Sequence, residues 1–199
     1  MIAFTDMTGL AGSAIAIAAL AARLPGAARL QRPYLALLLG VVMIVSLVPF
    51  GDVPLAAYVR GIIGDLSIVS LVLLLQSMTR PLCGWPEPDA QSRFALLALI
   101  ALAAAGLYPM ALGAGLFDPY RLGYGSQWLV GVLLVIALAA YIRRLTLVAL
   151  CLALAVLAWV AGWYESTNLW DCLLDPLLAM YAIGALAAHG ARKLRTPRS

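Results

Sequence analysis

Seven apolar segments run through this chain, and the connections between them alternate in charge. The segments cover residues 7–22, 34–50, 54–79, 94–112, 126–142, 145–163 and 170–188. About 20 apolar residues are needed to span the hydrocarbon core of a bilayer as a helix. We therefore expect an all-α membrane protein, a bundle of seven transmembrane helices forming a single polytopic domain over residues 1–199.

The basic residues predict how this bundle lies in the membrane. Alternate connections and the C-terminal tail hold 11 of the 13 Lys and Arg residues, and the other connections hold only Arg60 and Arg121. The larger set consists of Arg23, Arg29, Arg32, Arg80, Arg93, Arg143, Arg144, Arg192, Lys193, Arg195 and Arg198. Because Lys and Arg of short loops favour the cytoplasmic side, we expect the N-terminus outside and the C-terminus in the cytoplasm.

Composition narrows the class of protein further. Hydrophobic residues make up 64% of the chain and charged residues 11%, whereas a soluble domain is nearer half apolar and one quarter charged. Seven spans leave no room for a soluble catalytic domain. The net charge of +4 is explained by cytoplasmic flanks that contact anionic lipid headgroups, and we expect no nucleic-acid binding. The abundance of Ala, Leu and Arg indicates a multi-pass protein of the bacterial inner (plasma) membrane.

The N-terminal residues do not predict a cleavable signal peptide, and the cysteines do not predict disulfide bonds. The leading residues contain Asp6 but none of the Lys or Arg that begin a cleavable signal peptide. Cys83, Cys151 and Cys172 fall at different depths of the predicted bundle, too far apart to bridge. We expect three free thiols that pack as small apolar side chains.

Asp65 is the most unusual residue of the third segment. It would lie about 16 Å into a continuous helix, and an intramembrane carboxylate marks a functional site by default. Arg60 is close in sequence, but a spacing of five residues turns the two side chains about 140° apart around a helix. Asp65 is therefore expected to find a partner on another helix or to stay protonated. The alternative is a carboxyl group that only joins helices by hydrogen bonds.

The seventh segment brings two further acids to its predicted outer end. Ser166, Thr167 or Asn168 is expected to cap the helix, and Asp171 in the first turn would complement the helix dipole. Asp175 lies one turn deeper and on the same face, where two like charges repel.

This repulsion needs a partner from elsewhere in the bundle. A shared proton, a bound cation or an arginine such as Arg60 or Arg121 would relieve it. Pro176 either begins a regular helix or marks a kink. Because buried charges need partners, we predict that the third and seventh segments are neighbours, with Asp65 and Asp175 both inside the bundle.

Aromatic residues gather with these acids at the predicted outer interface. A membrane-interface belt would explain the rings without any function. A sharper hypothesis joins rings and carboxylates into an outward-facing pocket, because rings stack on sugars or hold cations and carboxylates accept sugar hydroxyls. The candidate binding residues are Arg60, Asp118, Tyr120, Arg121, Tyr124, Trp163, Trp170 and Asp171, and the candidate catalytic acids or bases are Asp65, Asp175 and Glu165.

Missing residue types exclude several chemistries. His189 is the only histidine, which excludes a bis-histidine haem and a histidine-rich metal site. The seventh segment has no lysine for a retinal Schiff base. No intramembrane serine has a basic partner, and no glycine–lysine loop could hold a nucleotide phosphate. We expect no cofactor and no metal.

Three functions stay open. The leading hypothesis is a non-catalytic binding or accessory component of a cell-envelope glycan or lipid system, in contact with membrane lipids. Its partner on the outer side would be a glycan, a lipid headgroup or another membrane protein. The second is a membrane-embedded enzyme acting on a lipid-linked or headgroup substrate. The third is a small ion-coupled carrier using Asp65 and Asp175, which the scarcity of polar residues in the inner halves disfavours.

Overall fold

The computed structural model describes residues 4–195, with side chains up to residue 193, and confirms a mostly helical chain, 77% helix. Its nine described α-helices are α1 (Phe4–Ala21), α2 (Arg32–Leu47), α3 (Leu55–Ile63), α4 (Ile68–Cys83), α5 (Ala90–Pro109), α6 (Gln127–Ile142), α7 (Thr146–Val160), α8 (Leu169–Leu173) and α9 (Pro176–Arg195). An antiparallel hairpin pairs β1 (Pro49–Phe50) with β2 (Val53–Pro54). Single helical turns cover Ala27–Arg29, Met110–Ala114 and Pro119–Gly123.

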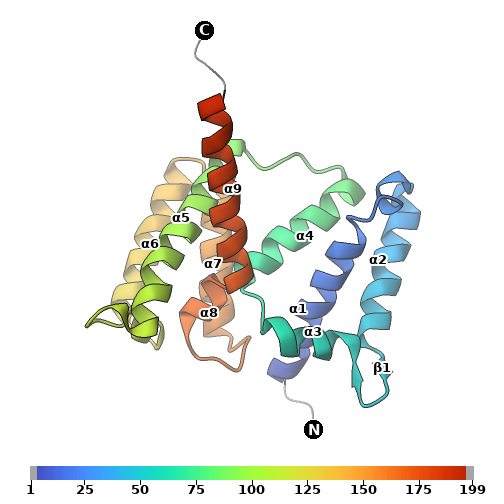
Figure 1. Cartoon of the computed structure of the whole chain (residues 1–199), viewed down its shortest axis with the longest axis horizontal. Helices are drawn as coiled ribbons and strands as arrows, with labels where there is room; N and C mark the ends of the chain where they lie inside the picture. The colour runs from blue at the N-terminus through green and yellow to red at the C-terminus, as the bar shows by residue number, and fades with distance from the viewer. Residues whose placement is uncertain (1–3, 196–199) are drawn as a thin grey trace.

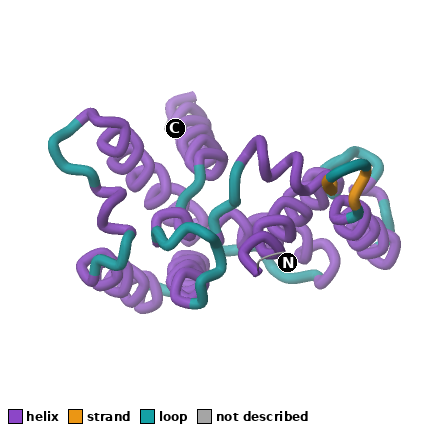
Figure 2. The backbone as a smooth tube through the Cα atoms, turned by 90° about the horizontal axis from the view of Figure 1, so that it is seen from below, coloured by secondary structure: helices purple, strands orange, loops and turns teal. Residues whose placement is uncertain are grey.

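The helices form two groups joined by the oblique helix α4 (Figure 1). Helices α1, α2 and α3 lie on one side of α4, and α5 to α9 lie on the other. The larger apolar core joins α4 to the second group around Val69, Ile100 and Val148, and the smaller core lies between α1, α2 and α4 around Ala18 and Leu39. Viewed from below, the groups lie side by side, with the β-hairpin at the edge of the first (Figure 2).

Successive connections alternate between the two ends of the molecule. The start of α1, the β-hairpin and the loops around residues 110–126 and 161–168 lie at the lower end of Figure 1. The connections 22–31, 84–89 and 143–145 and the end of α9 lie at the upper end. The fold therefore gathers the basic connections at the upper end. The side chains of Arg195 and Arg198 lie outside the described residues.

Two described helical stretches, Phe4–Ala21 and Ala90–Ala114, are long and apolar enough to cross a membrane by length and composition. The second comprises α5 and the helical turn that follows it. Four others are apolar but shorter: Arg32–Leu47, Ile68–Cys83, Gln127–Ile142 and Thr146–Val160. The all-α class is confirmed, whereas the bundle of seven transmembrane helices stays a prediction.

The third and seventh apolar segments are each broken. The first break corrects the expectation of a continuous helix, and the second falls at Pro176, where the sequence left a helix start or a kink open. Helix α3 ends at Ile63, and residues 64–67 are not helical before α4 begins. Gly64 has φ +74°, a conformation that glycine adopts without strain. Helix α8 ends at Leu173, and Leu174 is extended before Pro176 begins α9. Proline accounts for the second break, because it lacks an amide hydrogen and disfavours helical backbone in the residue before it.

Candidate functional site

The two helix breaks meet at the carboxylate of Asp175. Its Oδ2 accepts hydrogen bonds from the backbone N–H of Ser67 at 3.0 Å, the Ser67 hydroxyl at 2.7 Å and the Ser70 hydroxyl at 2.5 Å. Its Oδ1 accepts from the backbone N–H of Leu178 at 2.8 Å. Asp175 is only 4% exposed. Four protein donors therefore replace the water that a buried carboxylate loses.

Asp175 thereby serves the N-termini of two helices. It caps α9 through Leu178, while Ser67 caps α4 by accepting from the backbone N–H of Ser70 at 3.2 Å. Helix N-termini carry partial positive charge, so both helix dipoles stabilise this carboxylate. The third and seventh segments are neighbours, as predicted. The partners of Asp175 are hydroxyl and amide groups, however, and not Arg60 or Arg121.

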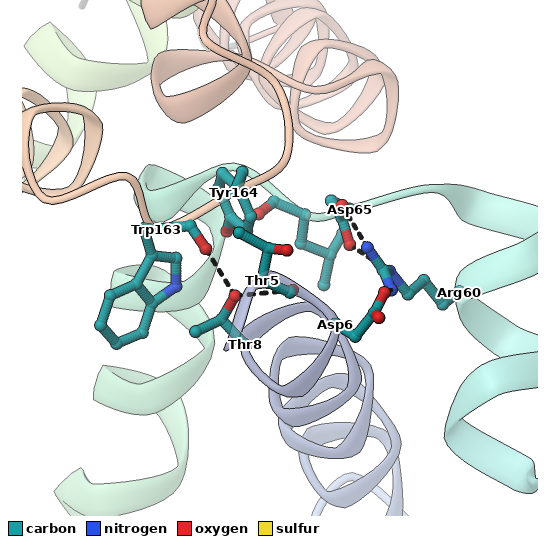
Figure 3. A network of polar contacts seen from close by, with 8 residues as sticks. Thr5, Asp6, Thr8, Arg60, Asp65, Trp163 and Tyr164 are labelled. Carbon is teal, nitrogen blue, oxygen red and sulfur yellow. Dashed lines mark hydrogen bonds and ion pairs between the residues drawn. The ribbon is translucent and has the colours of Figure 1, made fainter. Parts of the chain in front are cut away.

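Asp65 pairs with Arg60, contrary to the sequence argument. Nε and Nη2 of Arg60 donate to the two carboxylate oxygens of Asp65 at 2.6 and 3.0 Å, and Nη1 donates to Oδ1 of Asp6 at 3.1 Å. The expected separation of the two side chains was wrong because α3 ends at Ile63 and the chain turns at Gly64. The guanidinium lies between the carboxylates of Asp6 and Asp65 and so joins α1 to the first helix break (Figure 3).

Gly9 of α1 makes room for this ion pair. A Cβ at position 9 would overlap with Nε of Arg60 and Oδ1 of Asp65, and would lie 2.6 Å from Cζ of Arg60. Gly12, almost one turn further along α1, faces Leu71, and a Cβ there would lie 3.5 Å from Cδ2 of Leu71, an ordinary contact. The two glycines therefore differ in what an added methyl group would meet.

We expect Gly9→Ala to reduce the free energy of unfolding by about 1–3 kcal/mol, the usual effect of overpacking. Gly12→Ala should be neutral or stabilising by up to about 1 kcal/mol, because alanine favours a helix and the space is free. Both variants would be unfolded in the same detergent micelles. On an Arg60→Ala background, Gly9→Ala should lose most of its effect. Equal losses from the two glycine variants would contradict the close approach of Arg60 to α1.

Two hydrogen bonds tie the loop before α8 to the first helix group. The buried hydroxyl of Tyr164 donates to the carbonyl of Leu66, which lies within the first break and has no helical partner. Burial raises the pKa of Tyr164, so its hydroxyl stays protonated as the donor. The hydroxyl of Thr8 donates to the carbonyl of Trp163 at 2.5 Å (Figure 3).

Asp171 holds the long lower loop against α8. Its carboxylate accepts from the hydroxyl of Tyr120 at 3.0 Å to each oxygen and from the hydroxyl of Ser166. Burial, and after it the charge of Asp171, raise the pKa of Tyr120, so this phenol also stays a donor. Asp171 does not share a continuous helical face with Asp175, because α8 ends between them. The expected repulsion at one-turn spacing therefore does not arise in that form.

Asn168 is the centre of the same contact. It caps α8, accepting from the backbone N–H of Trp170 at 3.0 Å, and its Nδ2 donates to the carbonyl of Tyr120 at 3.0 Å. The indole N–H of Trp170 donates to the carbonyl of Pro119 at 3.0 Å. The predicted cap within residues 166–168 is thus confirmed, with Asn168 as the capping residue.

The other candidate residues lie around this network. Arg121, Tyr124 and Glu165 are exposed, and Asp118 caps the turn that follows it by accepting from the backbone N–H of Tyr120 at 3.0 Å. Tyr124 lines an open hollow of about 480 Å³ together with Trp159 and Tyr164. The ring of Trp163 contacts Phe4 edge-on, with centroids 6.0 Å apart. Neither Asp65 nor Asp175 lines that hollow.

A larger cavity lies between α1 and α9, above the network. Its volume is about 530 Å³, and it extends along α4 from Ser70 to Arg80. Most lining side chains are apolar, such as Ile17 of α1, Leu73 of α4 and Leu177 of α9. The sequence analysis missed this cavity, because its walls come from segments far apart in the chain.

The sequence analysis also missed Ser67 and Ser70, the main partners of Asp175. The available signal was a glycine–aspartate pair at 64–65 followed by serines three residues apart, a spacing typical of a helix N-terminus. Among the described residues, no buried side-chain nitrogen or oxygen lacks a hydrogen-bond partner. The chain matches no family model, no curated protein and no solved structure.

Proposed function

We propose that this protein is a non-catalytic membrane component that binds a lipid in the cavity along α4. The cavity is the observation that carries the proposal: about 530 Å³, mostly apolar and placed between two helix groups. Ligand sites are typically apolar clefts of roughly 300–1,000 Å³. The stretch from Ser70 to Arg80 rises by about 15 Å along the helix, half of a hydrocarbon core of about 30 Å. The acyl chain of a lipid from one leaflet fits this length.

The outer surface supports a place within the membrane. Large apolar side chains are almost fully exposed on several elements, among them Ile62, Trp128 and Ile142, whereas soluble monomers rarely expose large apolar patches. The alternation of basic and acidic ends favours seven crossings, with the upper end in the cytoplasm of a bacterial cell. The breaks suit this place because backbone groups within them, such as the carbonyl of Leu66 and the N–H of Ser67, bond within the protein, as hydrocarbon requires.

The carboxylates at the lower end support a binding component more than an enzyme. Asp175 accepts four hydrogen bonds from the protein. Both carboxylate oxygens of Asp65 accept hydrogen bonds from Arg60. A general acid or base must reach a proton of the substrate, and these oxygens are directed at the chain's own donors. In this proposal the lower network joins the two helix groups, and the cavity between the groups takes the lipid.

Lipid retention tests the proposal. The purified chain should keep about one lipid per molecule through delipidation in mild detergent, counted by native mass spectrometry. Ala16→Trp places a large ring in the cavity and should lower retention at least tenfold. Ala139→Trp is the matched control, because Ala139 is exposed on α6 and does not line the cavity. Equal retention by the two folded variants would contradict a lipid site along α4.

A further inference from the structure

We infer that the bound lipid is an anionic phospholipid of the cytoplasmic leaflet, whose phosphate lies between Arg23, Arg80 and Arg93. The inference rests on the proposed function and names the headgroup that the cavity takes. Arg23 follows the end of α1, Arg80 lies in the last turn of α4, and Arg93 lies near the start of α5. All three line the cavity. Their presence around one cavity is a property of the fold, because they come from three separate elements.

The rest of the upper end does not share this arrangement. Arg29, Arg143 and Arg144 are exposed at the same end of the molecule but do not line the cavity. The general excess of basic residues, which orients membrane proteins, therefore does not explain why three arginines lie at one opening. Arginine suits a phosphate group because its planar guanidinium donates two parallel hydrogen bonds.

The cavity opening carries more positive charge than the protein neutralises. Arg80 forms an ion pair with the exposed Glu87, and Nη2 of Arg93 donates to the hydroxyl of Tyr181 at 2.7 Å. The guanidinium of Arg23 has no hydrogen bond or ion pair with the residues that the structure describes. Among the described residues, Glu87 is the one carboxylate in an ion pair with any of these three guanidinium groups, and a phosphate diester would complement the remaining charge. Tyr181 lines the same cavity and offers its hydroxyl to the headgroup.

Polarity changes along the cavity in the order that a phospholipid requires. The three arginines line the cavity at the upper ends of α1 and α4 and the start of α5, Gln76 and Ser77 follow along α4, and Leu73 and Leu74 line the part below them. Ser70 lies at the deep end, where its hydroxyl is already bonded to Asp175. A charged headgroup at the opening and an acyl chain along the leucines would match this order. The upper opening lies at the cytoplasmic headgroup level if the upper end is cytoplasmic, as the proposed orientation requires.

The test compares two triple variants of the full chain. Delipidated protein in detergent is offered equimolar phosphatidylglycerol and phosphatidylcholine with matched acyl chains, and bound lipids are counted by native mass spectrometry. The wild-type chain should prefer phosphatidylglycerol. In the variant Arg23→Gln, Arg80→Gln, Arg93→Gln, the ratio of bound phosphatidylglycerol to bound phosphatidylcholine should fall roughly fivefold for each arginine removed. This variant should still bind lipid. The control variant Arg29→Gln, Arg143→Gln, Arg144→Gln removes the same charge and should keep the preference.

Each contrary outcome has a separate meaning. Equal binding of the two phospholipids by the wild-type chain overturns the anionic headgroup but leaves the lipid site. Equal losses in the two triple variants overturn the arginine cluster, because net charge alone would then explain the preference. A polyprenyl phosphate that displaces phosphatidylglycerol at tenfold lower concentration overturns the phospholipid as occupant. Absence of any bound lipid in the wild-type chain contradicts the proposed function itself.

Discussion

Replacing Asp175 with alanine should lower the free energy of unfolding by about 3–5 kcal/mol, because several buried donors lose their acceptor at once. The change removes the acceptor of two backbone N–H groups, those of Ser67 and Leu178, and of two hydroxyls. The hydroxyls can rotate toward other acceptors, whereas the N–H groups are fixed by the starts of α4 and α9. Each buried donor left unpaired costs about 1–3 kcal/mol, and the cap of α9 is lost as well.

Asparagine at the same position gives a graded result. Asp175→Asn keeps the shape but offers one acceptor oxygen, so its NH₂ group must face the N–H of either Ser67 or Leu178. We expect the free energy of unfolding to fall by about 1–3 kcal/mol, because one buried donor is left without an acceptor. Asp171→Asn is the matched control, with an expected loss below about 1 kcal/mol, because both donors to Asp171 are hydroxyls that can share one oxygen. The measurement is unfolding by SDS in mixed micelles, followed by circular dichroism.

The same variants separate the functions left open by the sequence. If Asp175 serves the fold, lipid retention per folded molecule should be unchanged in Asp175→Asn. A membrane enzyme or an ion-coupled carrier using Asp175 would instead lose its activity with the fold intact. Equal and negligible destabilisation by the two asparagine variants would contradict the role of Asp175 in joining the two helix breaks.

The positions of most helices follow from the sequence because apolar runs and charged connections are local properties. The breaks did not follow, although Gly64 and Pro176 were both visible. A glycine or a proline permits a break, but whether the chain takes it depends on acceptors and donors supplied from elsewhere. Here Tyr164 satisfies the carbonyl of Leu66, and Asp175 satisfies the N–H of Ser67. These partners are about one hundred residues away in the chain.

For the candidate site, the location of the residues could be predicted from the sequence, but their pairings could not. A gathering of acids and aromatic rings at one end was predicted from the alternation of the connections. The structure places Asp65 and Asp175 in the two helix breaks and brings Trp170 against the loop that holds Tyr120. Their pairings depended on the breaks, so Arg60 and Asp65 were wrongly separated by a helix that does not continue. The cavity depends on the oblique path of α4 between the two helix groups, which no local pattern of the sequence encodes.

Gly123 is where the long lower loop comes closest to another segment. A Cβ at this buried glycine would overlap with Oδ1 of Asn168 and would lie 2.5 Å from its Cγ and 2.8 Å from Cδ1 of Trp170. Asn168 is fully buried and cannot move outward. Its side chain also bonds the backbone of Tyr120 and Trp170, so any shift breaks hydrogen bonds on both sides.

We therefore expect Gly123→Ala to destabilise the fold by about 3–4 kcal/mol, because overpacking costs about 1–3 kcal/mol and each buried polar group left unpaired about as much. Gly131→Ala is the control: Gly131 lies in α6, and an added Cβ meets nothing within 4 Å. On an Asn168→Ala background the obstructing amide is gone, and Gly123→Ala should then cost less than about 1 kcal/mol. An undiminished loss in that double variant would show that the backbone at residue 123, and not its contact with Asn168, requires glycine.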